Sequence, residues 1–321
     1  MQKSNITVKD LARLCGVSIG TVDRAINNRP GISQKTREHI LQTAREYGYV
    51  KNQSARTLSS GRSNTIGVII FNLKSEYFAN ALTAIEEKAR HEGYNTMIML
   101  SDYDAETEME CARRMASMHV AGLIVFSVLR DPSFYVELQK SGTPVVALGN
   151  PIGGGIPFVG IDDRAAMEAS CAHVLSHGYR RIVYVAPLLE KAKTQNIAAQ
   201  SRRYEGFLAA MAQANVTTQV LDTYESYRET LAGIDTTAQA TAFLCPSDTY
   251  TLRCLELFRP DPPSVGIMGF DRFLTIGRLL PRLSGITYSS HDIGAAAVQV
   301  LLADTREDVL LPFTLVHGET V

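Results

Sequence analysis

Carboxylates stand shortly after three apolar runs of the sequence. Asp162 and Asp163 follow the run PFVGI, Asp248 follows TAFLC after two residues, and Asp271 follows SVGIMGF. In parallel α/β sheets a ligand binds beyond the carboxyl ends of the strands, where such residues gather. Carboxylates accept hydrogen bonds from hydroxyl groups, so these positions favour a pocket for a polyhydroxylated compound. Asp162 and Asp163 have a second interpretation, because either can cap a helix that begins near Ala165.

The sequence lacks the motifs of common catalytic sites. It holds neither a Gly-x-Ser-x-Gly nucleophile elbow nor a Walker phosphate loop, and the three glycines at 153–155 have no helix start after them, as in a plain loop. The five cysteines are an odd number without Cys-x-x-Cys spacing, so they predict neither a disulfide framework nor a zinc ribbon and fit a reducing cytosol. We therefore expect no enzymatic activity and no cofactor.

Charge is divided unevenly along the chain, although the formal net charge is only -1. Residues 1–62 hold 11 Lys and Arg against 4 Asp and Glu, a net charge of +7, whereas the other residues hold 21 against 29, a net charge of -8. A basic segment attracts the phosphates of nucleic acid, and an acidic body stays off such surfaces. The sequence shows neither an export signal nor a run of about 18 apolar residues, so we expect a cytoplasmic protein without membrane spans.

The carboxylates need a framework of strands to bring them together. From Thr65 onward apolar runs alternate with helical stretches, and this repetition predicts an α/β fold with doubly wound parallel sheets. The runs are IGVIIF, NTMIML, GLIVFSV, PVVALG, PFVGI, RIVYVA, TAFLC, SVGIMGF and GITY. So many strands over about 255 residues exceed one compact open sheet, which predicts two lobes with the ligand cleft between them.

The basic segment has the pattern of three short capped helices. Thr7 opens a Thr-x-x-Asp cap pattern with Asp10, Ser18 can cap a second helix that the turn NNRPG ends, and Ser33 can cap a third. Apolar residues recur at helical spacing in each segment, and a glycine turn separates the first two. Three helices around one small core predict an all-α helix-turn-helix head over residues 1–50.

The segment ITVKDLARLCGVSIGTVDRAINNRPGISQKTREHILQTAREYGYV closely resembles the head of the lactose-repressor (LacI/GalR) family. The residues that carry the resemblance, in the family's order and spacing, are Thr7, Asp10, Ala12, Gly16, Val17, Ser18, Thr21, Val22, Arg24, Asn27, Ser33, Thr36, Arg37, Gly48 and Tyr49. The resemblance implies a sequence-specific transcriptional regulator, in most such proteins a repressor, that binds double-stranded operator DNA.

By this resemblance a recognition helix begins at Ser18 and lies in the major groove. Ile19, Gly20 and Arg24 then stand where relatives reach base edges, and Arg24 is the candidate for bidentate recognition of guanine. The residues that would contact phosphates or support those contacts are Thr7, Ser18, Thr21, Asn27, Ser33, Thr36 and Tyr49.

Two positions of the head depart from the family pattern. Asp23 stands where relatives carry a small hydroxyl, and its carboxylate repels phosphate unless it pairs with Arg24 or Arg13 or accepts from a cytosine amino group. Gly20 has no side chain for base contacts, so specificity there must come from Ile19, Arg24 or the shape of the DNA. The operator sequence does not follow from these residues.

Residues 51–63 match the hinge of the family, with Lys51 in place of the usual proline. The resemblance implies that this segment becomes helical when two subunits lie together on the minor groove, and that Leu58 is the apolar wedge that kinks the DNA. Asn52 and Ala55 belong to the same DNA-contacting set. The alternative is a flexible linker with an incidental leucine.

The resemblance continues over nearly the whole chain and implies a body like a periplasmic sugar-binding protein. Residues 64–321 would form the effector domain, with an N-lobe of about 64–162 and 290–318 and a C-lobe of about 163–289. Three strands would cross between the lobes, near Asp162, Ser290 and Gly318. His173 and His177 stand four apart, but a family-like Leu-x-x-His-Gly turn explains His177 structurally, so we expect no metal site.

Five residues of the body are the candidates for ligand binding. The family places an aromatic ring at Phe78 that stacks on a sugar or a base, with packing into the core as the alternative. Arg203, in an Arg-x-x-Gly-aromatic segment, is implied as the main cationic contact, because its planar fork suits vicinal hydroxyls or a carboxylate. Asp162, Asp248 and Asp271 complete the set. Ser247 replaces the asparagine frequent in relatives, which removes an amide from the site.

The implied mechanism couples these parts. Effector binding changes the angle between the lobes, which orders or melts the paired hinge segments and so sets operator affinity. A homodimer on a pseudo-palindrome, or a tetramer, follows from that geometry. We expect a sugar or sugar derivative as the effector; the alternatives are a nucleobase and a protein co-regulator.

Overall fold

The computed structural model of the chain describes residues 6–49, 63–186, 189–222, 227–271, 274–280 and 282–321. The chain divides into two compact units, Met1–Gly61 and Arg62–Val321, which we call the head and the body. Among the described residues no helix is long and apolar enough to cross a membrane.

The head consists of helices α1 (Val8–Cys15), α2 (Ile19–Ile26) and α3 (Gln34–Glu46). Each helix begins at the predicted cap residue, and α1 ends at Gly16, whose φ of 63° lies in the left-handed region that glycine adopts without strain. Leu11, Val22 and Ile40, one from each helix, are fully buried and form the centre of a small core. The helix-turn-helix prediction is therefore confirmed.

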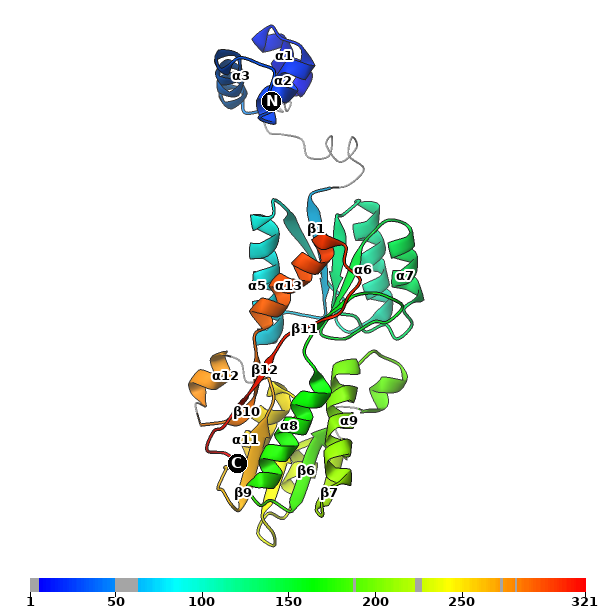
Figure 1. The fold of residues 1–321 in the computed structure, drawn as a ribbon, viewed down its shortest axis with the longest axis vertical. Coiled ribbons are helices and arrows are strands. Elements are labelled where there is room, and N and C mark those ends of the chain that lie inside the picture. The colour runs from blue at the N-terminus through cyan, green and yellow to red at the C-terminus, as the bar shows by residue number, and fades with distance from the viewer. Residues whose placement is uncertain (1–5, 50–62, 187–188, 223–226, 272–273, 281) are drawn as a thin grey trace. The chain divides into compact units, whose positions relative to one another are not determined.

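The body contains two six-stranded sheets, one in each lobe (Figure 1). The N-lobe sheet has the order β11-β5-β4-β3-β1-β2, and all its neighbours pair in parallel. Its strands are β1 (Thr65–Ile70), β2 (Asn95–Leu100), β3 (Gly122–Val125), β4 (Val145–Leu148), β5 (Phe158–Gly160) and β11 (Val309–Leu310).

Helices cover both faces of the N-lobe sheet, as a doubly wound fold requires. Ile66, Val68 and Ile70 of β1 pack toward α5 (Glu76–His91) and α13 (Ser290–Ala303), whereas Ile69 packs toward α6 (Ala105–Ser117) and α7 (Ser133–Lys140). The helices α5 and α13 approach closely, because a Cβ at Gly294 would lie 2.3 Å from the Ala81 carbonyl oxygen.

The C-lobe sheet has the order β12-β10-β9-β8-β6-β7 and is parallel except at β12. Its strands are β6 (Arg181–Ala186), β7 (Thr217–Asp222), β8 (Thr241–Leu244), β9 (Val265–Gly269), β10 (Ser284–Tyr288) and β12 (Phe313–Val316). The strand β12 leaves a lobe crossing while β10 runs toward one, so the two pair antiparallel.

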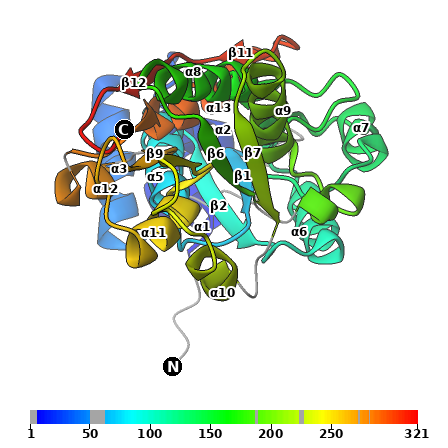
Figure 2. The same cartoon turned by 90° about the horizontal axis from the view of Figure 1, so that it is seen from below.

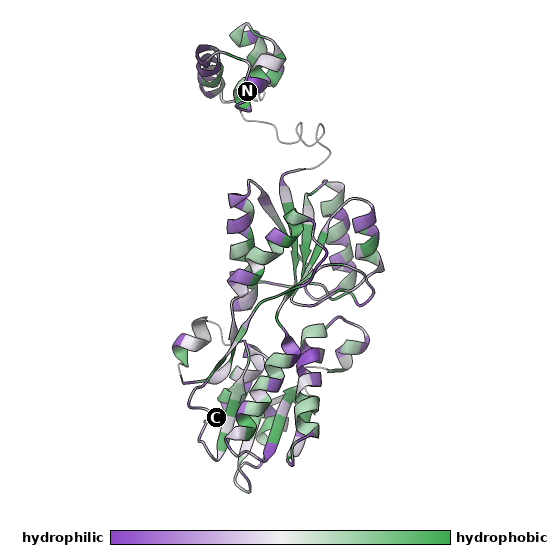
Figure 3. Cartoon of the chain, viewed as in Figure 1, coloured by the Kyte–Doolittle hydropathy of each residue, from purple (hydrophilic) through white to green (hydrophobic). Residues whose placement is uncertain are grey.

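The C-lobe sheet is also covered on both faces. Figure 2 shows α8 (Asp163–Ser176) and α9 (Ala198–Ala212) on one face, and α10 (Tyr227–Ala232) and α11 (Asp248–Leu257) on the other. The shorter elements are the 3-10 helix η1 (Leu189–Lys193) and α12 (Leu274–Leu279). Figure 3 shows the hydrophobic strands enclosed between helices that carry hydrophilic residues outward, which is the expected distribution for buried parallel sheets.

The chain crosses between the lobes three times. The first crossing follows β5 at Ile161-Asp162, and the second lies at Ser289 between β10 and α13. The third lies at residues 311–312 between β11 and β12, not near Gly318 as predicted. Gly318 belongs to the C-lobe, because the next residue, Glu319, donates its backbone N–H to the Arg282 carbonyl oxygen.

The predicted fold class is confirmed, and all nine apolar runs form strands. Three strands were not predicted: β7 has the polar sequence TTQVLD, β11 has only two residues, and β12 is a short terminal strand. Each lies at the edge of a sheet, where pairing with one neighbour defines the strand and little apolar surface needs to be buried.

Candidate functional site

Hydroxyl residues of the head that were predicted to contact phosphate cap the helices. The Ser18 Oγ accepts a hydrogen bond from the Thr21 N–H at 3.1 Å and lies 2.9 Å from the Thr21 hydroxyl. Ser33 and Thr36 repeat this arrangement at α3, and Thr7 caps α1. Such caps lie beside the free backbone N–H groups of a helix start, which attract phosphate.

The helix α2 has one buried and one exposed side. Val22 and Ala25 face the core, whereas Ile19, Gly20 and Arg24 are exposed, Ile19 by 49%. The three residues predicted to reach base edges are therefore all accessible to a partner.

Asp23 pairs within the head, with neither of the predicted arginines. Its Oδ1 accepts from the Asn27 amide at 2.6 Å, and its Oδ2 lies 3.0 Å from the Arg29 guanidinium, whereas Arg13 pairs within α1. The suggested pairing of Asp23 with Arg24 or Arg13 is thus wrong, because the turn after α2 brings Arg29 back to Asp23.

Arg37 stabilises the turn after α2 by hydrogen bonds. Its position in the sequence did not predict this role. Its guanidinium donates to the carbonyl oxygens of Arg24 at 3.0 Å and Arg29 at 2.6 Å.

Tyr49 packs partly buried against the head core, and burial raises the pKa of its hydroxyl. Three further predicted DNA contacts, Asn52, Ala55 and Leu58, lie outside the described residues.

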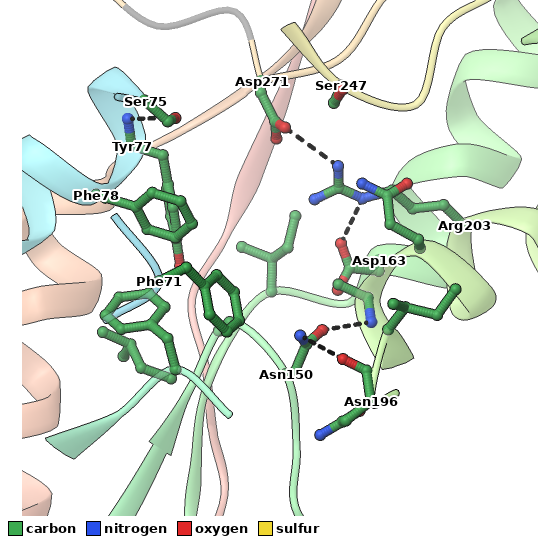
Figure 4. Close-up of a pocket in the computed structure, with 18 of the residues that line it drawn as sticks. Phe71, Ser75, Tyr77, Phe78, Asn150, Asp163, Asn196, Arg203, Ser247 and Asp271 are labelled. Atoms are coloured by element: carbon green, nitrogen blue, oxygen red, sulfur yellow. Dashed lines mark hydrogen bonds and ion pairs between the residues drawn. The ribbon is translucent and has the colours of Figure 1, made fainter. Parts of the chain in front are cut away.

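A cavity of about 280 Å³ lies between the two lobes of the body (Figure 4). Phe78, Arg203, Asp248 and Asp271 line it, so four of the five predicted ligand-binding residues come together. The remaining lining comes from strand ends of both sheets, from helix starts and from residues 195–200 at the start of α9. Its volume is close to the range of about 300–1,000 Å³ that is usual for small-molecule sites.

The N-lobe side of the cavity is an aromatic wall. The rings that line it are Phe71, Tyr77, Phe78, Tyr103 and Phe126. Phe78 contacts Phe71 and Phe126 edge to face, with ring centres 5.7 and 5.2 Å apart, and Phe71 stacks on Tyr103 at 4.5 Å. Phe78 therefore packs against the core and also faces the cavity, so both interpretations of this residue hold.

The opposite side carries a buried ionic cluster centred on Arg203. Its Nε lies 2.8 Å from Asp163 Oδ1, its Nη1 lies 3.2 Å from Asp271 Oδ2, and Nη1 also donates to the Pro246 carbonyl oxygen at 2.5 Å. The guanidinium stacks on Phe270, 3.8 Å from the ring centre. Figure 4 shows this cluster facing the aromatic rings across the cavity.

Asp163, and not Asp162, is the aspartate of the first lobe crossing that lines the cavity. Asp162 is exposed and caps α8, accepting from the Ala165 N–H at 2.9 Å. The prediction that Asp162 binds the ligand is corrected, because the cap residue of α8 is exposed while the next residue enters the helix and pairs with Arg203.

Two asparagines that the sequence did not single out join the lobes beside the cavity. Asn150, after β4, donates to the Asn196 carbonyl oxygen at 3.1 Å and accepts from the Ala199 N–H at 3.0 Å. Asn196 donates in turn to the Pro151 carbonyl oxygen at 3.0 Å. Asn150 follows an apolar run, and this position is the signal that would have found it.

Burial shifts the ionisation of the acids around the cavity. It raises the pKa of Asp163 to about 6, because the loss of solvent outweighs the attraction of Arg203. Burial, followed by the charge of Asp271, raises the pKa of Asp248. Tyr288 donates to Asp271 Oδ1 at 2.6 Å, and burial together with that carboxylate raises its pKa.

The described residues hold no group of three metal-ligating side chains suited to an ion. His177 has a structural role, since its Nδ1 lies 2.9 Å from the His173 carbonyl oxygen one turn earlier in the chain. The ligand class of the cavity is therefore inferred from its aromatic, amide and ionic groups.

Comparison with known proteins agrees with this architecture. Residues 7–52 match the family model described as "Bacterial regulatory proteins, lacI family", and residues 63–233, more than half of the chain, match "Periplasmic binding proteins and sugar binding domain of LacI family". Residues 171–321 also match "Periplasmic binding protein-like domain".

Individual relatives align over almost the whole chain. Catabolite control protein A of Priestia megaterium is 27% identical over 92% of each chain, and the ribose operon repressor of Halalkalibacterium halodurans is 24% identical over 98% of this chain and 96% of its own. The lac repressor dimer bound to operator and the anti-inducer ONPF has the same fold, with a TM-score of 0.84 at 20% identity over 99% of each chain.

The head, the two-lobed body and the matched family models agree on one identity. The relatives include an operon repressor and HTH-type transcriptional regulators, as the sequence predicted for this chain. The protein is a DNA-binding regulator and belongs to the lacI family of bacterial regulatory proteins.

Proposed function

We propose that a sugar or sugar derivative, bound in the cavity of the body, controls the affinity of the head for operator DNA. The observation that carries this proposal is the pair of unlike walls around the cavity. Aromatic rings line the N-lobe side, and carboxylates, amides and Arg203 line the other. A sugar has the matching chemistry, with C–H faces that pack on rings and hydroxyls that donate to carboxylates.

The residues of the cavity have distinct parts in this proposal. Phe78 and its neighbouring rings cover one face of the sugar, and Asp248 and Asp271 accept hydrogen bonds from its hydroxyls. Arg203 donates to ring or hydroxyl oxygens of the sugar. Asp163 holds the guanidinium in position, with its Oδ1 2.8 Å from Arg203 Nε. The matched sugar-binding family model and the ribose operon repressor among the relatives support a sugar rather than a nucleobase.

The head reads the operator through α2 in this proposal. Arg24 donates to guanine, Ile19 contacts a base edge, and the capped starts of the helices, together with Asn27 and Tyr49, hold the phosphates. Asn52, Ala55 and Leu58 remain proposed contacts in the hinge segment. A homodimer on a pseudo-palindromic site follows from the family relationship, and the cytoplasm is the compartment where such a site occurs.

Sugar binding acts on the operator through the equilibrium between two arrangements of the lobes. A ligand that contacts both walls binds more tightly where the walls are closer, so it shifts the population toward that arrangement. The amide contacts of Asn150 and Asn196 join the same two lobes and respond to the same change.

The proposal is tested in two linked measurements on the full chain. Selection from random DNA with the purified protein identifies an operator, and thermal unfolding is then followed against a panel of sugars, polyols, nucleosides and purines. We expect a sugar to raise the unfolding temperature, since it binds the native state, and to change operator affinity in a mobility-shift assay. A shift with purines alone, or with no compound, would overturn the sugar assignment.

Arg24→Ala separates base recognition from general attraction to DNA. We expect it to weaken binding to the selected operator by about 1–3 kcal/mol and to relax the sequence preference at one position. Arg13→Ala, an exposed arginine of α1, is the matched control. Equal losses for the two variants would contradict the proposed role of Arg24.

A further inference from the structure

The described residues that line the cavity carry an excess of negative charge. Their acidic side chains are Asp163, Asp248 and Asp271, and their basic side chain is Arg203. With the carboxylates ionised, the lining has two more negative charges than positive ones. This balance constrains the charge of the effector, and the inference rests on the proposed sugar site.

The positive charge of the lining is already neutralised inside the protein. Two carboxylates lie within 3.2 Å of the Arg203 guanidinium, a carbonyl oxygen accepts from Nη1, and the ring of Phe270 covers one face. The side chain of Arg203 is only 6% exposed. A second anion in the cavity would compete for an arginine whose charge is shared between two acids.

Asp248 presents its carboxylate to the cavity. It lies at the start of α11, half-buried, and its Oδ1 accepts from the Thr249 N–H at 2.6 Å and the Thr249 hydroxyl at 3.2 Å. Among the three lining acids of the described residues, Asp163 and Asp271 form direct ion pairs with Arg203 and Asp248 forms none.

We propose that the effector is an electrically neutral sugar, and that the cavity rejects sugar phosphates and sugar acids by charge. Neutral hydroxyls donate to Asp248 and Asp271, and C–H groups pack on the aromatic wall. A phosphate or a carboxylate in the same place meets a lining with two more carboxylates than cations, in a partly desolvated site where repulsion between like charges is strong. The lining acids therefore act both in binding and in discrimination.

The test compares matched pairs of compounds by calorimetry with the full-length protein. The pairs are glucose with glucose 6-phosphate and with gluconate, ribose with ribose 5-phosphate, and fructose with fructose 6-phosphate. In each pair that binds, the neutral member is expected to bind at least about tenfold more tightly than the anionic one. An anionic member that binds as tightly as its neutral partner, or more tightly, overturns the inference.

Asp248→Asn distinguishes charge from size, because it removes one charge and leaves the shape of the side chain unchanged. We expect it to reduce the ratio between the affinities for the neutral and the anionic compound of a pair about tenfold, mainly by strengthening the binding of the anion. Asp304→Asn removes an exposed carboxylate from the end of α13 and is the matched control, with an unchanged affinity ratio. An unchanged affinity ratio in Asp248→Asn means that the cavity rejects the anionic compound by its size, and overturns the inference.

A second measurement needs no variant. Salt screens partly buried charges only weakly, so the difference in affinity between neutral and anionic partners is expected to shrink modestly as the salt concentration rises; a difference that grows with salt contradicts the inference. Failure of the proposed function gives a different result: no sugar binds, or a neutral sugar binds and leaves operator affinity unchanged. Tighter binding of the anionic member contradicts the charge inference alone.

Discussion

Arg203 and Asp163 form an ion pair that is almost completely removed from solvent. The Nε of Arg203 lies 2.8 Å from Asp163 Oδ1, and the two side chains are 6% and 3% exposed. The pair joins α9 to the start of α8, at the edge of the cavity where the chain first crosses between lobes. The cost of removing two charges from water offsets much of the attraction between them. The pair therefore orders the site more than it stabilises the fold.

Arg203→Ala is expected to lower the free energy of unfolding of the body by about 3–5 kcal/mol, because it leaves Asp163 buried without its partner. It also removes the main donor of the site, so sugar binding is lost. Urea denaturation of the full chain measures the first effect and calorimetry the second.

The control for this change removes both charges together. The double variant Arg203→Met with Asp163→Asn leaves no stranded aspartate at 163, so most of the lost stability is expected to return while sugar binding stays absent. A double variant as unstable as Arg203→Ala would show that the loss does not come from Asp163, and would assign it to packing around Arg203 or to Asp271, its other ion-pair partner.

Asp163 gives the stability of the body a definite dependence on pH. Burial raises its pKa from 3.8 to about 6, so the folded state holds this proton more tightly than the unfolded state does. The associated stability is fully present below about pH 4 and is lost as the pH rises through about 6, an effect of about 3 kcal/mol.

Asp163→Asn isolates this contribution, because the amide does not titrate. The free energy of unfolding of the native protein, relative to that of the variant, is expected to fall between pH 4 and pH 7. Denaturant titrations across this range measure it. A difference that stays constant or rises with pH would contradict the raised pKa of Asp163.

The sequence predicted those parts of the fold that local patterns specify. Each apolar run of the body became a strand, and each cap residue of the head began its helix. The polar edge strand β7 was missed, because pairing with β6 defines it and apolar periodicity does not.

In the site, Arg203 was found through a motif, but Asp162 was chosen over Asp163. One residue of displacement at a helix start turns a side chain by about 100°, so the sequence alone could not decide between them. Asn150 and Asn196 were missed for another reason: they contact each other only because two lobes fold together, and no local pattern encodes that contact.

Asn196→Ala removes one side-chain hydrogen bond that joins the lobes beside the cavity and one within its own segment. The side chain donates to the Pro151 carbonyl oxygen and accepts from the Ala198 N–H at 3.2 Å, and it is 9% exposed. We expect a loss of about 1–3 kcal/mol in the free energy of unfolding, since the partly buried Pro151 carbonyl is left without its donor. Thr194→Ala, an exposed neighbour, is the control and is expected to change little. Similar losses in both variants would assign the effect to the loop backbone.

Asp23→Asn is expected to tighten DNA binding by the head. Asp23 is a carboxylate on the helix proposed to enter the major groove, and its charge offsets that of Arg29, 3.0 Å away. The amide retains the shape of the side chain and a polar contact with Asn27, while Arg29 becomes free to neutralise a phosphate. The slope of the logarithm of affinity against the logarithm of salt concentration is therefore expected to steepen by about 1. Mobility-shift titrations at several salt concentrations measure this slope, with Glu38→Gln on the exposed side of α3 as the charge-matched control. If both variants steepen the slope equally, the effect belongs to the net charge of the head; if only Asp23→Asn does so, Asp23 limits the contact of α2 with DNA.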